Sequence, residues 1–141
     1  MTYSSQFYQV CQSLNARGYA IAQSTEKQLI QDDNLIVEHR PVPLPQASGI
    51  VYHLRQIWCG LHLLFSAIRF RANVVIASSG TSYWFVFSLF SWLGIKVIPS
   101  VHCTLWYKYL PQRPVDKLIL GLSRNFFASQ CQAIMAVSHD I

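Results

Sequence analysis

Three short polar segments follow apolar stretches of the chain, and each carries side chains that could bind or transform a ligand. They are SSGTS (78–82) after VVIA, HCT (102–104) after KVIPSV, and SHD (138–140) after AIMAV. An imidazole can hold a substrate hydroxyl or stabilise developing charge. A serine- and glycine-rich turn before a helix can receive an anionic or hydroxyl-rich ligand. These residue types predict a binding site for a polar, oxygen-rich molecule.

His102 is the candidate for a catalytic side chain, because it directly follows an apolar segment typical of a buried strand. The alternative is a half-buried structural histidine. Cys103 is not a convincing nucleophile partner for it, since neighbouring residues of an extended chain point to opposite sides. Around the same segments, the candidate substrate-binding residues are Ser79, Gly80, Thr81, Thr104 and Ser138. A plain helix N-cap explains the serines of SSGTS equally well.

The motifs of several cofactor and metal sites are missing from these segments. SSGTS has neither the lysine of a phosphate-binding P-loop nor the three spaced glycines of the GxGxxG turn. His139 and Asp140 are adjacent, and adjacent residues rarely chelate one metal together. The four cysteines are far apart and have no zinc-site spacing. We therefore expect no metal and no other cofactor.

Apolar periodicity predicts the elements that position these segments. Strands are expected at 19–22, 34–39, 74–77, 96–101 and 133–137, and helices at 5–17, 50–71, 83–93 and 115–129. Apolar strands that alternate with helices predict an α/β fold, Rossmann-like, with a mostly parallel sheet between two helical layers. Ligands of such sheets bind at the carboxyl ends of the strands. All three polar segments would share that rim.

Composition and charge restrict the class of protein. The 141 residues fit one domain, and 52% hydrophobic against 12% charged residues predict a collapsed, globular chain. The net charge of +5 comes from scattered lysines and arginines, which argues against nucleic-acid binding and supports only a mild attraction to phosphorylated ligands or anionic lipid headgroups. The widely spaced cysteines and the absence of a signal-peptide pattern predict a cytoplasmic protein with reduced thiols.

A membrane-associated alternative stays open at this point. Residues 73–95 contain no charged side chain, and this stretch is long enough to span a bilayer. The segment SSGTS, however, divides it into a strand and a short helix. The alternative function is a small interaction protein without enzymatic activity, in which residues 79–95 insert and helix 50–71 lies on the membrane surface. Arg55, His62 and Arg69 would form the polar stripe of that helix, although a solvated helix face explains them as well.

Four segments, in their order along the chain, resemble a known family. NVVIASSG, LFSWLGIKVIPSVHCT and QCQAIMAVSHDI are similar to DVVHAHG, LGIPVVVTVHG and ADAVIAVSE in the first domain of family-four glycosyltransferases of the GT-B type, and LNARGYAIAQST is similar to LAKRGHEVTVLT. The resemblance implies a sugar transferase that uses a nucleotide-activated donor and no obligatory metal, and whose first domain holds the acceptor. His102 matches the family histidine that reaches the cleft near the transferred sugar. Ile76 and Ser78 stand where the family often has histidines.

The resemblance also implies that parts of the family's enzyme are missing. The chain begins within the family's first helix, without the preceding strand and glycine-rich loop, and it ends where the second, donor-binding domain should follow. We therefore expect residues 1–141 to be a partial N-terminal domain, truncated at both ends and inactive alone.

The complete enzyme would transfer a sugar from a nucleotide-sugar donor to a glycan or lipid-linked acceptor. The missing central strand predicts marginal stability and a need for a complementary polypeptide. The expected location is cytoplasmic, with peripheral contact at the inner membrane face as an alternative.

Overall fold

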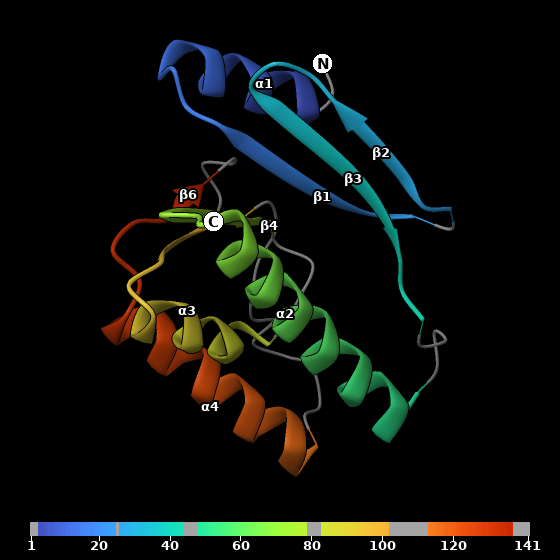
Figure 1. The fold of residues 1–141 in the computed structure, drawn as a ribbon. Helices are drawn as coiled ribbons and strands as arrows, with labels where there is room; N and C mark the ends of the chain where they lie inside the picture. The colour runs from blue at the N-terminus through green and yellow to red at the C-terminus, as the bar shows by residue number, and fades with distance from the viewer. Residues whose placement is uncertain (1–2, 25, 44–47, 79–82, 102–112, 137–141) are drawn as a thin grey trace. The chain divides into compact units, whose positions relative to one another are not determined.

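A computed structural model describes residues 3–24, 26–43, 48–78, 83–101 and 113–136 of the chain (Figure 1). The chain divides into two compact units, a first unit of Met1–Gln46 and a second unit of Ala47–Ile141. The elements in chain order are α1 (Tyr3–Ser13), β1 (Gly18–Ser24), β2 (Gln28–Gln31), β3 (Leu35–Pro41), α2 (Ile50–Phe70), β4 (Val74–Ser78), the 3₁₀ helix η1 (Trp84–Phe87), α3 (Ser88–Trp92), β5 (Lys96–Val101), α4 (Pro114–Ser129) and β6 (Met135–Ala136).

The first unit is a three-stranded sheet with one helix. Its strand order is β1-β3-β2, with β1 parallel and β2 antiparallel to β3. Helix α1 contacts β1 closely at Gly18, where an added methyl group would lie 2.5 Å from Sγ of Cys11 and 3.0 Å from a ring carbon of Phe7. Only glycine fits this contact without moving its neighbours. Gly18 is therefore the first residue of β1 and allows α1 to pack closely against the sheet.

A charged network joins the two parallel strands of the first unit. Arg40 donates to both carboxylate oxygens of Glu38, over 2.9 Å from Nε and 2.7 Å from Nη2, and the Tyr19 hydroxyl hydrogen-bonds the same carboxylate. The hydrogen bonds from Arg40 lower the pKa of Glu38 from 4.5 to about 2, with a further contribution from Tyr19 and with burial acting in the opposite direction. The carboxylate therefore stays ionised in the folded protein at mildly acidic pH.

The first unit should consequently lose stability in acid. A carboxyl group whose pKa is depressed by folding stabilises the protein above its unfolded pKa, and this contribution disappears as the pH falls from 4.5 to about 2. We expect a loss of about 1 kcal/mol over this interval, measured by urea unfolding at several pH values. Glu38→Gln should abolish this pH dependence, whereas Glu26→Gln, at an exposed carboxylate of the same unit, should retain it. An unchanged acid profile in Glu38→Gln would contradict the assignment.

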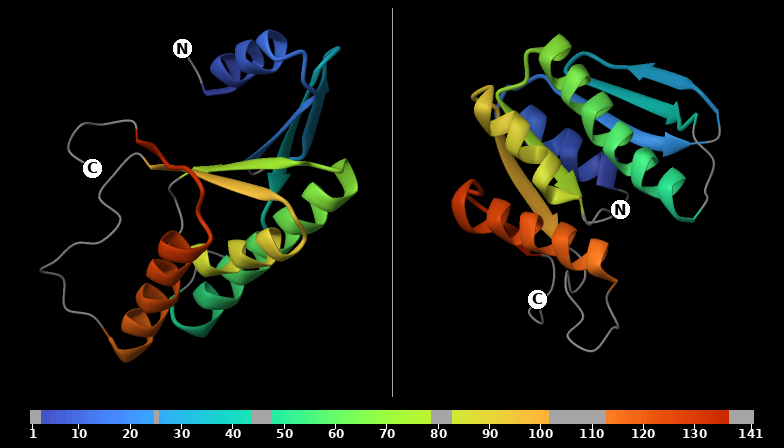
Figure 2. Two further views of the ribbon diagram at one scale, coloured as in Figure 1. Left: turned by 90° about the vertical axis from the view of Figure 1, so that its left-hand side faces the viewer. Right: turned by 90° about the horizontal axis from the view of Figure 1, so that it is seen from below.

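The second unit contains a parallel sheet of order β4-β5-β6. Helices α2, α3 and α4 all lie on one face of this sheet (Figure 2). The core lies between that face and the helices, and it is formed by Ala67, Ala77, Trp84, Phe87, Phe90, Ile95, Val97 and Phe126. Residues of β4 alternate accordingly, since Ala77 is buried while Val74 and Ile76 are exposed.

The α/β class with mostly parallel strands is confirmed, because three of the four strand pairs among the described residues are parallel. Strand β2 was not expected. The predicted helix 83–93 is divided into η1 and α3, and its first turn, WFVF, is aromatic and β-branched, which disfavours a regular α-helix. Gly94, with φ of 76°, ends the helical segment as predicted. Within the described ranges, no helix is long and apolar enough to cross a membrane.

Replacing either of two helical glycines of the second unit by alanine should change the free energy of unfolding, in opposite directions at the two positions. A methyl group at Gly60 in α2 would lie 2.8 Å from Cγ1 of the buried Val86, whereas one at Gly121 in α4 meets nothing within 4 Å. Gly121→Ala should raise the free energy of unfolding by about 0.5–1 kcal/mol, because alanine favours the helix. Gly60→Ala should lower the free energy of unfolding by about 1 kcal/mol, because the clash of the added methyl group with Val86 outweighs the helix preference of alanine. Urea midpoints that shift equally would contradict the contact between α2 and η1.

Candidate functional site

The carboxyl ends of the three strands of the second unit form one rim. Ser78 at the end of β4 pairs with Ser100, and Val101 at the end of β5 pairs with Ala136 of β6, so the three strands end level with one another. Helix α4 follows β5 along the chain and ends shortly before β6, which is parallel to β5, so α4 is the crossover between these two strands. The rim is the edge at which open parallel sheets bind ligands.

The residues predicted from the sequence follow these strand ends. Candidate residues Ser79, Gly80, Thr81, His102, Thr104 and Ser138 lie outside the described residues. Ser79 directly follows the last residue of β4, and His102 directly follows the last residue of β5. The described strands thus bring the starts of these segments to one edge, and the individual roles of the side chains stay predictions.

A described group of aromatic side chains joins the start of α2 to Tyr83, which follows the carboxyl end of β4 by five residues along the chain. Nδ1 of His53, in the first turn of α2, hydrogen-bonds the hydroxyl of Tyr83, which lies between β4 and η1. Tyr52 packs edge-on against Tyr83, with ring centroids 6.3 Å apart and an interplanar angle of 66°. Tyr83 is only 3% exposed, whereas Tyr52 is 41% exposed. We call Tyr52, His53 and Tyr83 the rim cluster.

The start of α4 contributes charge to the rim cluster. Burial raises the pKa of Tyr83, and the charges of Tyr52 and Asp116 raise it further. Asp116 lies in the first turn of α4, where its Oδ2 accepts a hydrogen bond of 3.1 Å from the backbone N–H of Arg113. The Tyr83 hydroxyl therefore keeps its proton at neutral pH and is available as a donor.

Sequence reasoning did not find the rim cluster, because His53 and Tyr83 are 30 residues apart and form no motif. One signal could have located His53. Helix 50–71 precedes strand 74–77 with only a short connection, so the two elements run in roughly opposite directions, and the 21-residue helix extends well past the carboxyl end of the five-residue strand β4. The rim rule applies to the first turn of this helix as well as to the loops after the strands.

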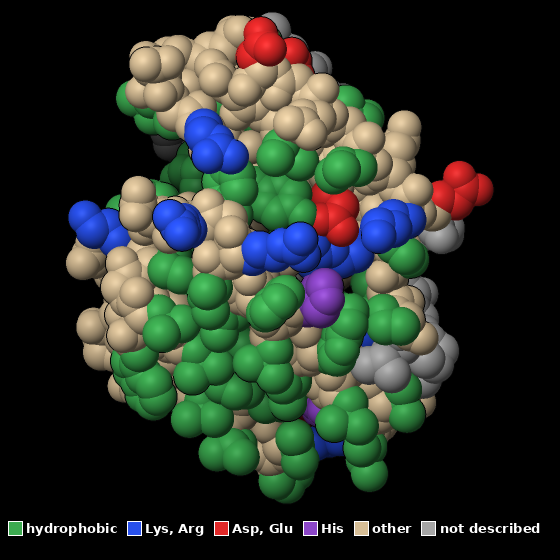
Figure 3. Space-filling view, viewed as in Figure 1, with side chains coloured by type: hydrophobic (Ala, Val, Ile, Leu, Met, Phe, Trp, Pro, Cys, Tyr) green, Lys and Arg blue, Asp and Glu red, His purple; other side chains and the backbone are tan. Residues whose placement is uncertain are grey.

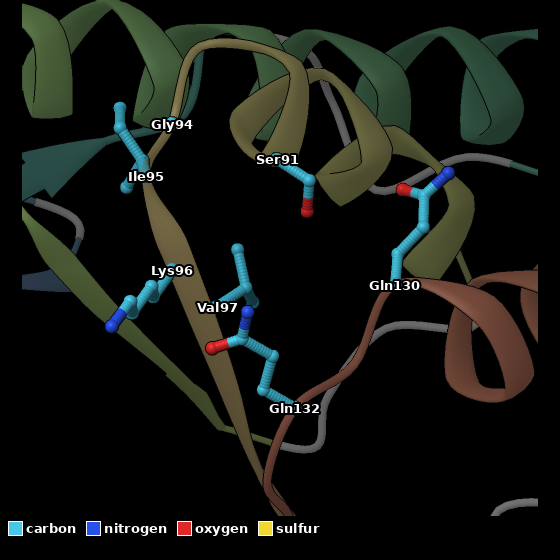
Figure 4. Close-up of a pocket in the computed structure, with 7 residues that line it drawn as sticks. All are labelled: Ser91, Gly94, Ile95, Lys96, Val97, Gln130 and Gln132. Carbon is cyan, nitrogen blue, oxygen red and sulfur yellow. The ribbon is translucent and has the colours of Figure 1, made fainter.

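A small pocket lies at the opposite end of β5. Ser91 from α3, residues 94–97 at the start of β5, and Gln130 and Gln132 after α4 line about 160 Å³ of space (Figure 4). Oε1 of Gln130 is buried there and has no hydrogen-bond partner among the described residues. Because this pocket is at the amino end of the strand, we assign the candidate site to the rim and not to the pocket.

A parallel sheet with helical crossovers and a polar rim at its carboxyl ends defines a Rossmann-like domain. The family model of Glycosyltransferase Family 4 matches residues 4–141, and the chain belongs to this family. The predicted resemblance to a family-four glycosyltransferase N-terminal domain is thereby confirmed. Searches of the curated proteins and of the solved structures found no match.

Proposed function

We propose that this chain is the acceptor-side domain of a glycosyltransferase, and that the acceptor binds at the rim of the second unit. The proposal is supported by membership of the family and by the level carboxyl ends of β4, β5 and β6. A complete enzyme of this type also needs a donor-binding domain that holds a nucleotide-sugar. The proposed reaction is sugar transfer to a glycan or lipid-linked hydroxyl, and the 141-residue chain alone does not turn over.

The proposed roles follow from the residue types at the rim. The hydroxyls of Ser79, Thr81, Thr104 and Ser138 hydrogen-bond the acceptor, and Gly80 allows its close approach to the backbone. His102 holds a hydroxyl close to the bond that is exchanged or stabilises charge that develops there. No step of this proposal requires a metal ion.

Saccharide binding by the chain itself tests this function. In saturation-transfer difference NMR, methyl glycosides of glucose, mannose and N-acetylglucosamine should receive saturation from the 141-residue protein. His102→Ala should weaken the effect. His62→Ala is the control, because His62 stacks on Trp58 within α2, with ring centroids 4.6 Å apart. If no glycoside receives saturation, the acceptor-domain proposal is wrong.

A second candidate function, peripheral membrane contact, is favoured by apolar side chains on the helical face of the second unit (Figure 3). Leu54, Leu61, Phe65 and Ile68 of α2 are between 46% and 61% exposed and recur at helical spacing. The net charge of +5 complements an anionic lipid surface. By contrast, Trp84, Phe87 and Phe90 are buried in the core, which argues against insertion of residues 79–95.

Vesicle binding tests the second candidate. The protein should sediment with vesicles of phosphatidylcholine and phosphatidylglycerol, and less with phosphatidylcholine alone. Phe65→Ser should reduce this binding, because Phe65 is 61% exposed on the proposed surface. Equal recovery with and without vesicles would exclude this function and leave the acceptor-domain proposal unaffected.

A further inference from the structure

Tyr83 of the rim cluster follows the carboxyl end of β4 along the chain, yet none of the cluster residues is among those predicted from the sequence. It combines a buried hydroxyl, a partly exposed imidazole and an exposed aromatic ring, from Tyr83, His53 and Tyr52 respectively. The buried member holds the imidazole through a hydrogen bond. A ligand would therefore meet an arrangement that is already ordered.

The hydrogen bond between His53 and Tyr83 determines what the imidazole can offer a ligand. A protonated phenol donates to Nδ1, and a neutral imidazole that accepts at Nδ1 carries its own proton on Nε2. In that arrangement the Tyr83 hydroxyl orients His53, and the remaining ring nitrogen is an N–H donor, suited to the oxygen of a hydroxyl group. The reverse hydrogen bond, from Nδ1–H to the phenol oxygen, would leave Nε2 as an acceptor, and the tautomer of His53 distinguishes the two.

The exposed ring of Tyr52 supplies a surface for a sugar. Tyr52 is 41% exposed, and an exposed aromatic ring packs against the apolar C–H face of a pyranose. Its ring also packs edge-on against that of Tyr83, which fixes its position beside His53.

We propose that Tyr52 and His53 form a saccharide subsite of the second unit, and that Tyr83 is its positioning residue. The ligand is a pyranose ring of the acceptor, stacked on Tyr52 and hydrogen-bonded by Nε2–H of His53. This inference rests on the proposed function and deepens it. The competing explanation is structural, namely that the hydrogen bond between His53 and Tyr83 only fixes the first turn of α2.

The test combines histidine NMR with glycoside titration of the 141-residue chain. Long-range ¹H–¹⁵N spectra should show His53 as the Nε2–H tautomer, and His53→Gln identifies its signals. Methyl glycosides of glucose, mannose and N-acetylglucosamine should shift these signals and leave those of His62 unchanged. Tyr83→Phe should lose the single tautomer and weaken glycoside binding about fivefold.

The variants of Tyr52 separate recognition from folding, since Tyr52 is exposed and tolerates substitution. Tyr52→Ala should weaken glycoside binding about tenfold, and Tyr52→Phe should retain it because the ring is kept. Affinity that is unchanged in Tyr52→Ala and His53→Gln, but reduced in His102→Ala, would refute the subsite and leave the proposed function standing. Variants that lower only the urea midpoint would establish the structural explanation. If no glycoside binds at all, both proposals fall.

Discussion

Phe90→Ala should lower the free energy of unfolding of the second unit by about 3–5 kcal/mol. Phe90 has no exposed surface and packs against Phe87, with ring centroids 5.2 Å apart, inside the core cluster. Its truncation removes buried apolar area and leaves a cavity that the neighbouring aromatic rings cannot fill. Because small domains are stable by only about 5–15 kcal/mol, this loss removes much of the total. Urea unfolding monitored by tryptophan fluorescence measures it.

The matched control for Phe90 lies two residues further along α3. Trp92 is 77% exposed, so Trp92→Ala should change the free energy of unfolding by no more than about 0.5 kcal/mol. The pair compares two large aromatic side chains of one short helix on opposite sides of its surface. Similar midpoints for the two variants would show that α3 is not packed on the sheet as described.

Ala77→Asp should unfold the second unit. Ala77 is 6% exposed in the core cluster, and a carboxylate at this position would be buried without a partner. Desolvating an unpaired charge costs several kcal/mol, comparable with the whole stability of a small domain. The loss of near-ultraviolet circular dichroism and of dispersed methyl resonances would report the unfolding.

The neighbouring position on β4 provides the control for Ala77→Asp. Ile76 points to the opposite face of the sheet and is 44% exposed, so Ile76→Asp should leave the fold intact. The contrast tests the finding that α2, α3 and α4 lie on one face of this sheet (Figure 2). Unfolding by both substitutions, or by neither, would contradict it.

The elements with strong periodicity and clear end signals could be predicted from the sequence. Strand 96–101 has the predicted bounds, and helix 50–71 differs from α2 by one residue. Helix 5–17 ends earlier, at Ser13, and Asn15 then takes a left-handed conformation with φ of 49°. Strand β2 was missed because QLIQ is short, fully exposed and flanked by polar residues, and its pairing with β3 is a tertiary contact that no local pattern encodes.

The rim of the candidate site was predictable and the rim cluster was not. The rule that ligands bind at strand carboxyl ends needs only the order of strands and helices, which the sequence supplies. The bond between His53 and Tyr83 instead depends on how far α2 extends past β4, and thus on packing. Local propensity carries no information about such a distance.

The strand orders leave β1 at one end of its sheet and β4 at one end of the other. Among the described residues, each of these strands has a ladder partner on one side only, so its outer row of amides and carbonyls is a template for another extended chain. We propose that a complementary polypeptide occupies such a row. In its absence a second copy would compete for the same template, so a purified sample should form larger assemblies as the protein concentration rises.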